Sequence, residues 1–204
     1  MSNNSENKKL VKCWLDCDPG HDDACAILLA SFCKKIEIIG ISTVSGNQTI
    51  EKTSKNALNV LNLLGLISES DTEKSLPFSL ITGSGRPLLR PSVICGEIHG
   101  ESGLETHSSI EFPKIPQHAY DHFERINSTK RHFTTSIYEH LKQEAEPVTL
   151  IATGPLTNVA NLIINYRDVN KYIEKIVLMG GAAGVGNTGP VAEFNIQVDP
   201  EVNS

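Results

Sequence analysis

Residues 11–32 read VKCWLDCDPGHDDACAILLASF, and this stretch decides the fold because its periodicity changes in the middle. Val11 to Cys17 alternates in polarity and is bounded by Pro19-Gly20, which predicts a β-strand. From Asp22 to Phe32 the apolar residues recur at helical spacing, which predicts a helix directly after the turn. The stretch therefore predicts a first βα unit.

Strands and helices continue to alternate along the chain. The expected strands span residues 36–44, 80–82, 148–152 and 176–179, and the expected helices span 50–64, about 128–144 and 155–166. Residues 68–79 have the composition of a solvated loop, and residues 96–120 show little periodicity. The alternation predicts an α/β fold over residues 10–204, an open, mostly parallel sheet with helices on both faces, preceded by a polar tail at 1–9.

Composition narrows the class of partner. The net charge of −6, with no cluster of lysine and arginine, argues against binding to nucleic acid. No stretch reaches 18 apolar residues, which argues against a membrane span, and the five cysteines lack the CxxC spacing of a zinc site. We expect a cytoplasmic protein with free thiols that acts on a small molecule.

Four aspartates, Asp16, Asp18, Asp22 and Asp23, lie within eight residues where the first strand should end and its helix begin. Open α/β sheets bind ligands at this edge. Four ionised carboxylates this close would repel one another, so a bound divalent cation is the simplest interpretation, and oxygen ligands on a flexible loop favour Ca²⁺. In the alternative, the acids only cap the helix and interact with its dipole. His21, among them, is either a site residue or a solvated loop residue.

The decapeptide LDCDPGHDDA at 15–24 resembles the amino-terminal signature of the inosine-uridine-preferring nucleoside hydrolases. Five further segments match that family in order: ISTVSGN at 41–47, HGESG at 99–103, TGPLTN at 153–158, VLMGG at 177–181, and AEFNI at 192–196 with DPE at 199–201. The resemblance covers nearly the whole chain. It implies a Rossmann-like core and hydrolysis of ribonucleosides to ribose and free base.

The resemblance also assigns the acidic residues. It implies that Asp18 and Asp23 ligate Ca²⁺ together with the backbone carbonyl of Thr153. Asp22 would hold ribose hydroxyls near the ion, and Asp16 would orient the ligand loops from behind them. Asp18 would also act as the general base toward a water held by calcium, which pairs a metal that acidifies water with a proton acceptor.

The remaining site residues are implied by the same resemblance. Asn47 would contact the nucleophile and the sugar, and Met179 would line the sugar pocket. Asn187, Glu193 and Asn195 would bind ribose hydroxyls, whose hydrogen bonds strengthen as the sugar gains oxocarbenium character. His99 lies where the family has a histidine on the base side, although a structural histidine beside a glycine turn is the alternative.

Two rival motifs are weaker. Residues 184–189, GVGNTG, match GxGxxG after an expected strand, but Pro190 follows directly and no helical period continues, which excludes the dinucleotide-binding context. Asp16-Cys17-Asp18 is similar to the DxD of Mg²⁺-dependent phosphatases, but Gly20 stands where those proteins usually carry Thr or Val.

Nucleoside hydrolases continue past the Asp-Pro-Glu segment, and their later part supplies a further calcium-binding Asp and an adjacent His that protonates the leaving base. We therefore expect a family domain that is incomplete at the C-terminal end, with an exposed sheet edge. An inactive remnant that binds ribose or calcium weakly is the alternative function. The family implies a homodimer or homotetramer, and the base preference cannot be read from this sequence.

Overall fold

The computed structural model describes residues 10–68, 76–107 and 111–203, so the expected polar tail at 1–9 and most of the loop at 68–79 lie outside the described residues. The elements in chain order are β1 (Val11–Cys17), α1 (His21–Phe32), β2 (Ile36–Thr43), α2 (Ile50–Leu63), β3 (Ser79–Thr82), α3 (Gly96–His99), α4 (Gln117–Asn127), α5 (Phe133–Gln143), β4 (Val148–Ala152), α6 (Thr157–Asn165), β5 (Ile173–Leu178) and α7 (Phe194–Val198), with short 3-10 turns at Val169–Lys171 and Pro200–Asn203.

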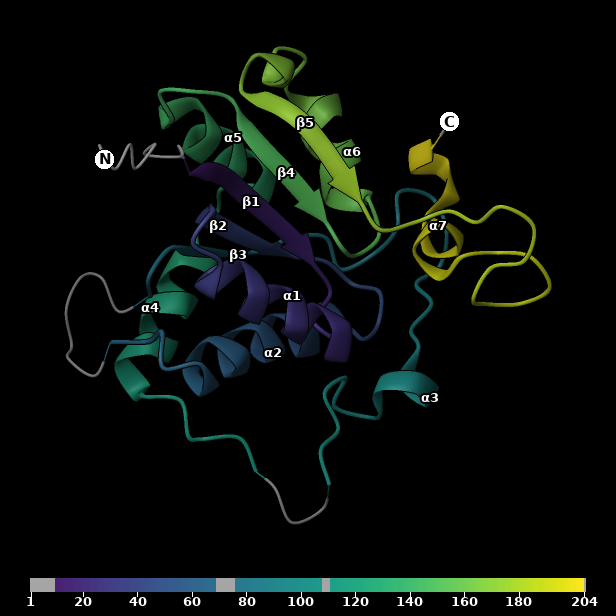
Figure 1. The fold of residues 1–204 in the computed structure, drawn as a ribbon, viewed down its shortest axis with the longest axis horizontal. Coiled ribbons are helices and arrows are strands. Elements are labelled where there is room, and N and C mark those ends of the chain that lie inside the picture. Colours follow the sequence, from purple (N-terminus) through teal and green to yellow (C-terminus); the bar gives the residue numbers. More distant parts are fainter. Residues whose placement is uncertain (1–9, 69–75, 108–110, 204) are drawn as a thin grey trace, which may run out of the picture.

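The five strands form one parallel sheet in the order β3-β2-β1-β4-β5 (Figure 1). The chain first builds outward from β1 to β3 and then returns to the other side of β1 with β4. This reversal leaves a crevice beyond the carboxyl ends of β1 and β4, the place where open α/β sheets bind ligands. The expected parallel α/β sheet is confirmed.

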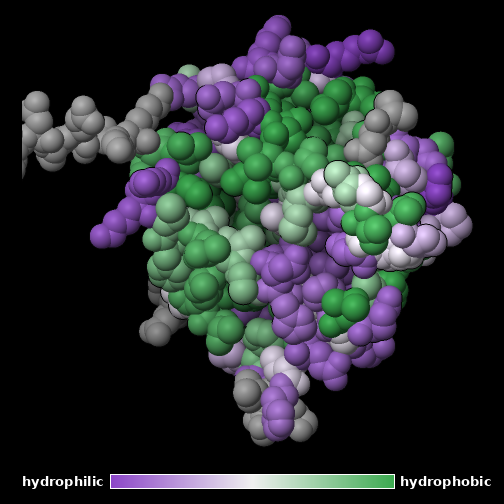
Figure 2. All heavy atoms as spheres, turned by 45° about the vertical axis from the view of Figure 1, so that its right-hand side comes forward, coloured by the Kyte–Doolittle hydropathy of each residue, from purple (hydrophilic) through white to green (hydrophobic). Residues whose placement is uncertain are grey.

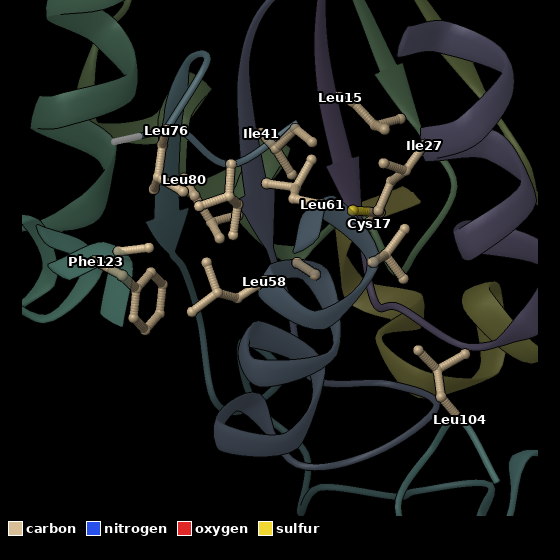
Figure 3. Close-up of a cluster of buried hydrophobic side chains, with 14 residues drawn as sticks. Leu15, Cys17, Ile27, Ile41, Leu58, Leu61, Leu76, Leu80, Leu104 and Phe123 are labelled. Atoms are coloured by element: carbon tan, nitrogen blue, oxygen red, sulfur yellow. The ribbon is translucent and has the colours of Figure 1, made fainter. Parts of the chain in front are cut away.

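One hydrophobic layer lies between the sheet and helices α1, α2 and α4 (Figure 3). Leu15 and Cys17 of β1 point into it and meet Ile27 of α1 and Leu61 of α2, all of them buried. Burial of one such leucine or isoleucine stabilises the fold by about 2 kcal/mol. The layer therefore anchors α1, whose first turn carries Asp22 and Asp23.

A second hydrophobic layer covers the opposite face. Trp14 points away from Leu15, as neighbours in a strand must, and packs among Leu141 of α5, Leu150 of β4 and Leu162 of α6. The expectation of helices on both faces is thus confirmed, and β1 is buried on both sides.

The helical segment between β3 and β4 departs from expectation. A helix was expected over about 128–144, but α5 begins only at Phe133. A separate helix, α4, spans Gln117–Asn127 and begins at the end of the stretch 96–120, which showed little periodicity. Only Ala119 and Phe123 of α4 are buried, so its apolar stripe is too narrow to stand out in the sequence. Two features of the sequence indicated this helix: it begins directly after Pro116, and Ala119 and Phe123 are four residues apart.

Strand β5 is the edge of the sheet on the β4 side, and its apolar side chains are exposed. Ile176, Val177 and Leu178 are between 39% and 47% exposed. Figure 2 shows a hydrophobic area that adjoins a hydrophilic one on the face of the molecule that is turned forward in that view. Among the described residues no strand pairs with the outer side of β5. Separately, no helix in the described part of the chain has the length and apolar character to cross a bilayer.

Candidate active site

The candidate site lies where β1, β2 and β4 end. Asp18 follows β1, Asn47 follows β2 and Thr153 follows β4, and parallel pairing brings these three ends to one edge of the sheet. A backbone hydrogen bond of 2.8 Å from the Thr153 N–H to the Asp16 carbonyl fixes two of the loops together. The chain thereby gathers polar groups that are more than 100 residues apart in sequence.

Asp18 is buried at the centre of this edge, with 1% exposure. Its Oδ2 accepts a hydrogen bond of 2.7 Å from the backbone N–H of Asn47, whereas its buried Oδ1 has no protein partner. Burial raises the pKa of Asp18 well above its usual value, and the nearby charge of Asp23 raises it further. A buried carboxylate with one unpaired oxygen is costly unless a proton or a cation neutralises it.

Asp23 is fully buried beside Asp18 and is better satisfied. Its Oδ1 accepts a 2.6 Å hydrogen bond from the Thr153 hydroxyl, and its Oδ2 accepts from the Gly20 N–H and the Asn47 Nδ2, each at 3.1 Å. Burial raises the pKa of Asp23 to about 6 although these donors favour the charged form. Asn47 bridges both acids, since the same Nδ2 also donates to the Asp18 carbonyl at 3.0 Å.

The donor set fits a hard cation. Asp18 and Asp23 supply carboxylate oxygens, and one of them lacks any protein donor, while the Thr153 carbonyl accepts from Asn195 and keeps a second lone pair. Among the described residues no group of three or more His, Cys, Asp or Glu side chains converges as a metal site, and the buried carboxylates at this edge are those of Asp18 and Asp23. A hard cation held here would complete its coordination with water or substrate oxygens.

Two glycines make room for the Asp18 carboxylate. A Cβ on Gly46 would overlap Asp18 Oδ2 and lie 2.9 Å from the ring of Pro155, and a Cβ on Gly154 would lie 2.7 Å from Asp18 Oδ1. Any side chain at these positions would fill the space around the carboxylate oxygens. The glycines are therefore part of the candidate cation site.

Gly46→Ala is expected to weaken calcium binding at least tenfold and to lower the free energy of unfolding by about 1–3 kcal/mol, because the methyl group displaces the Asp18 carboxylate. Isothermal titration calorimetry with CaCl₂ and thermal unfolding measure both effects. Gly96→Ala is the matched control, since its Cβ meets only the end of the Gln48 side chain at 3.3 Å. Equal calcium affinity in the two variants would contradict this assignment.

Asp16 points away from the other acids into the α5/α6 layer. Its Oδ1 accepts from the Ser42 hydroxyl and from Asn158 Nδ2 at 2.8 Å, and Ser42 in turn accepts from Trp14 Nε1 at 2.9 Å. Burial raises the pKa of Asp16 to about 7. Asp16 and Asp18 therefore lie in different surroundings and do not converge on one site, which argues against the DxD interpretation.

A cleft of about 450 Å³ opens beside the buried acids. Seven of the residues implicated by the sequence line it: Asp22, Asn47, His99, Met179, Asn187, Glu193 and Asn195. Six more were not singled out: Cys95, Glu97, Ile98, Thr188, Gly189 and Phe194. Their proximity to His99, Asn187 and Glu193 in sequence was the only signal. The cleft is about the size of a small-molecule site.

The segment that closes the cleft is held by α7. Glu193 caps this helix, since its Oε1 accepts from the Asn195 N–H and its Oε2 accepts from the N–H groups of Ile196 and Gly181, each at 3.1 Å. Asn195 is buried, and its Nδ2 donates to the carbonyls of Thr153 and Met179 at 2.8 and 2.9 Å. These two bonds fix the amide of Asn195 and leave its Oδ1 as an acceptor beside the cleft.

Asn187 belongs to the GVGNTG stretch, which forms a loop. Its Oδ1 accepts from the Phe194 N–H at 2.8 Å, and an isolated bridge joins Thr188 to Ala192. No helix starts until Phe194, so the glycines do not open a helix that could bind a pyrophosphate. The dinucleotide reading of this motif is excluded by the structure as well.

The chain resembles known proteins along most of its length. The family model described as inosine-uridine preferring nucleoside hydrolase matches residues 13–202. The pyrimidine-specific ribonucleoside hydrolase RihA of Shewanella sp. strain MR-7 is 43% identical over 187 residues, which are 92% of this chain and 52% of that protein. RihA of Escherichia coli O139:H28 is 42% identical, with 92% and 53% covered. The chain thus spans about half the length of these relatives.

Solved structures of nucleoside hydrolases also match this chain. An inosine-guanosine nucleoside hydrolase superposes with a TM-score of 0.75 at 29% identity, covering 94% of this chain and 56% of the other. A purine-preferring ribonucleoside hydrolase from Gardnerella vaginalis also superposes with a TM-score of 0.75 at 29% identity, covering 94% and 55%. The matched family model, the sequence identity and the shared fold agree, and this chain belongs to the inosine-uridine preferring nucleoside hydrolase family.

Proposed function

We propose that this chain hydrolyses the N-glycosidic bond of ribonucleosides, giving ribose and a free base, with Ca²⁺ held by Asp18, Asp23 and the Thr153 carbonyl. The observation that carries the proposal is the unpaired, buried Oδ1 of Asp18 at the edge of a polar cleft. Calcium bound there would supply a positive charge that polarises a water molecule and the ribose hydroxyls.

The side chains of the cleft and the buried acids are suited to different steps of this reaction. Asp18 is suited to accept the proton of the attacking water, since its Oδ2 is fixed by Asn47 and its Oδ1 is free of protein donors. Asp22 is exposed on the cleft wall, where it can accept hydrogen bonds from ribose hydroxyls. Glu193 and Asn195 lie in the same cleft, and acceptors there favour the oxocarbenium-like sugar of the transition state.

We infer that pyrimidine ribonucleosides are preferred. The two relatives quoted by sequence are named pyrimidine-specific and share 42–43% identity with this chain, whereas the purine enzymes among the solved structures share 29%. Identity is thus greater toward the pyrimidine enzymes.

The proposal is tested by incubating the protein with uridine, cytidine or inosine and measuring the reducing sugar that is released. We expect uridine and cytidine to be cleaved faster than inosine, activity to disappear in EDTA, and CaCl₂ to restore it, because the two buried carboxylates need a cation. A phosphate ester with Mg²⁺ is the control substrate and should release no phosphate. Turnover that persists in EDTA would rule out the calcium assignment.

A second candidate function is binding without catalysis. It is favoured by the donor set within the described residues, which brings two buried carboxylates, those of Asp18 and Asp23, to the edge of the cleft. In that case calorimetry would detect binding of calcium or ribose by a cooperatively folded protein that releases no sugar from any nucleoside.

We further propose that the protein acts in the cytoplasm as a homo-oligomer on small nucleosides. All five cysteines are free, which suits a reducing compartment, and exposed apolar side chains on β5 offer contact surface to another subunit.

A further inference from the structure

His21 and His99 form a pair of rings at the mouth of the cleft. Their centroids are 5.5 Å apart with planes at 25°, and the two Nδ1 atoms are 3.2 Å apart. The His21 Nε2 lies 3.1 Å from the backbone carbonyl oxygen of Glu105. His99 lines the cleft, whereas His21 does not, so His21 supports the His99 ring from behind.

The partners fix where the hydrogen atoms of a neutral pair must be. A carbonyl oxygen only accepts, so the contact with Glu105 requires a hydrogen on His21 Nε2. A neutral His21 ring then has a bare Nδ1, which is an acceptor. For the two Nδ1 atoms, 3.2 Å apart, to form a hydrogen bond in this neutral pair, the Nδ1 of His99 carries the hydrogen and donates it.

We propose, on the basis of the nucleoside hydrolase function above, that His21 is a positioning residue that holds His99 in its Nδ1–H tautomer. The Nε2 of His99 is then a bare nitrogen on the part of the ring away from His21, and it offers a hydrogen-bond acceptor to an N–H group of the nucleobase. Gly20 makes the pairing possible, because a Cβ there would lie 2.7 Å from His99 Nδ1.

The structure also contains the competitor that would reverse the tautomer. The backbone N–H of residue 21 points at the same His99 Nδ1 from 3.4 Å. Without the imidazole of His21, which accepts from His99 Nδ1, this N–H is the remaining partner of that nitrogen, and it requires a bare Nδ1 on His99. The hydrogen of a neutral His99 then moves to Nε2, and the group facing the base changes from acceptor to donor.

Long-range ¹H–¹⁵N NMR of the imidazole nitrogens tests this directly, with His99 assigned through His99→Gln. We expect the Nδ1–H tautomer in the parent and the Nε2–H tautomer in His21→Phe. His21→Asn should keep the parent tautomer, because the Asn Oδ1 occupies nearly the same place as His Nδ1 and accepts. Glu105→Gln is the matched control, since the contact is made by the backbone carbonyl.

Substrate preference supplies a second measurement. Cytidine and uridine exchange donors and acceptors on the base edge, so the ratio of their kcat/KM values should change about tenfold in His21→Phe and stay unchanged in His21→Asn and Glu105→Gln. An Nε2–H parent, or a tautomer unaffected by His21→Phe, overturns the pairing. If the tautomers are as predicted but the ratio of the kcat/KM values for cytidine and uridine does not change, the role of His99 in base recognition is overturned. NMR needs no turnover, so an inactive parent with the predicted tautomers counts against the proposed hydrolase function alone.

Discussion

Asp18→Asn is expected to reduce nucleoside turnover by roughly 10³-fold and, at the same time, to stabilise the calcium-free protein at pH 8. The first effect follows because the proposed proton acceptor is lost, and general bases contribute about 10²–10⁴ in rate. The second follows because Asn47 still finds an acceptor at position 18, while the buried negative charge disappears. A substitution that removes activity and adds stability is the signature of a functional carboxylate.

The pKa values of the buried acids determine in which direction the stability of the calcium-free protein changes with pH. The pKa of Asp16 is raised to about 7 and that of Asp23 to about 6, in each case mainly by burial, and that of Asp18 is raised as well. The folded state therefore binds protons more tightly than the unfolded state. The stability from these groups is fully present below their usual pKa of 3.8 and is lost as the pH rises through about 6–7.

Urea unfolding in EDTA from pH 5 to pH 8 measures the effect. The free energy of unfolding of the parent should fall by a few kcal/mol as the pH rises, since each unit of pKa shift corresponds to about 1.4 kcal/mol. Asp18→Asn should show a shallower slope, and calcium at about 100 times its Kd should add about 2.7 kcal/mol to the parent only. Asp121→Asn, on the exposed side of α4, is the control and should behave as the parent. A parent that becomes more stable toward pH 8 in EDTA would contradict the reasoning.

The fold was largely predictable from the sequence because its strongest patterns arise from burial. The strand β1 is enclosed on both faces, and α1 follows it directly, so the change from strand to helix periodicity is sharp. The helix α4 was missed because two buried residues, Ala119 and Phe123, hold it against the sheet, and a stripe that narrow resembles a loop. Periodicity thus reports the depth of burial more reliably than it reports helical structure.

The candidate site was predictable only in part. The acids were evident because four carboxylates in eight residues demand compensation. Their division between two surroundings was not, since Asp16 and Asp18 have the same place in the strand alternation and differ only because β1 ends at Cys17, between them. The pairing of His21 with His99 joins residues 78 positions apart and leaves no local pattern. Contacts of this kind depend on how distant loops pack against each other at the edge of the sheet. No pattern in the sequence around either residue predicts them.

Asn158→Ala should be the most destabilising of the substitutions considered, at about 3–5 kcal/mol, which corresponds to a fall in Tm of about 10 °C or more. Asn158 is buried, and its Nδ2 donates to Asp16 Oδ1 and to the Thr43 carbonyl while its Oδ1 accepts from the Ser84 N–H, each at 2.8 Å. Alanine removes one hydrogen bond from each of the three partners, including the fully buried Asp16 carboxylate, and a buried polar group that loses a partner costs more than the bond itself contributes.

The matched control is Asn165→Ala in the same helix, α6, where the side chain is exposed and donates only to the preceding turn. Differential scanning fluorimetry at pH 8 should show a change of no more than about 2 °C for this control. Because Asn158 joins β1, β2 and the loop at Ser84, its loss should also loosen the loops that carry Asn47 and Asp18, so calcium binding should weaken in Asn158→Ala and not in the control. Equal Tm values for the two alanine variants would show that the Asp16 network contributes nothing net to stability, and that the acidic edge is held by packing of the two hydrophobic layers alone.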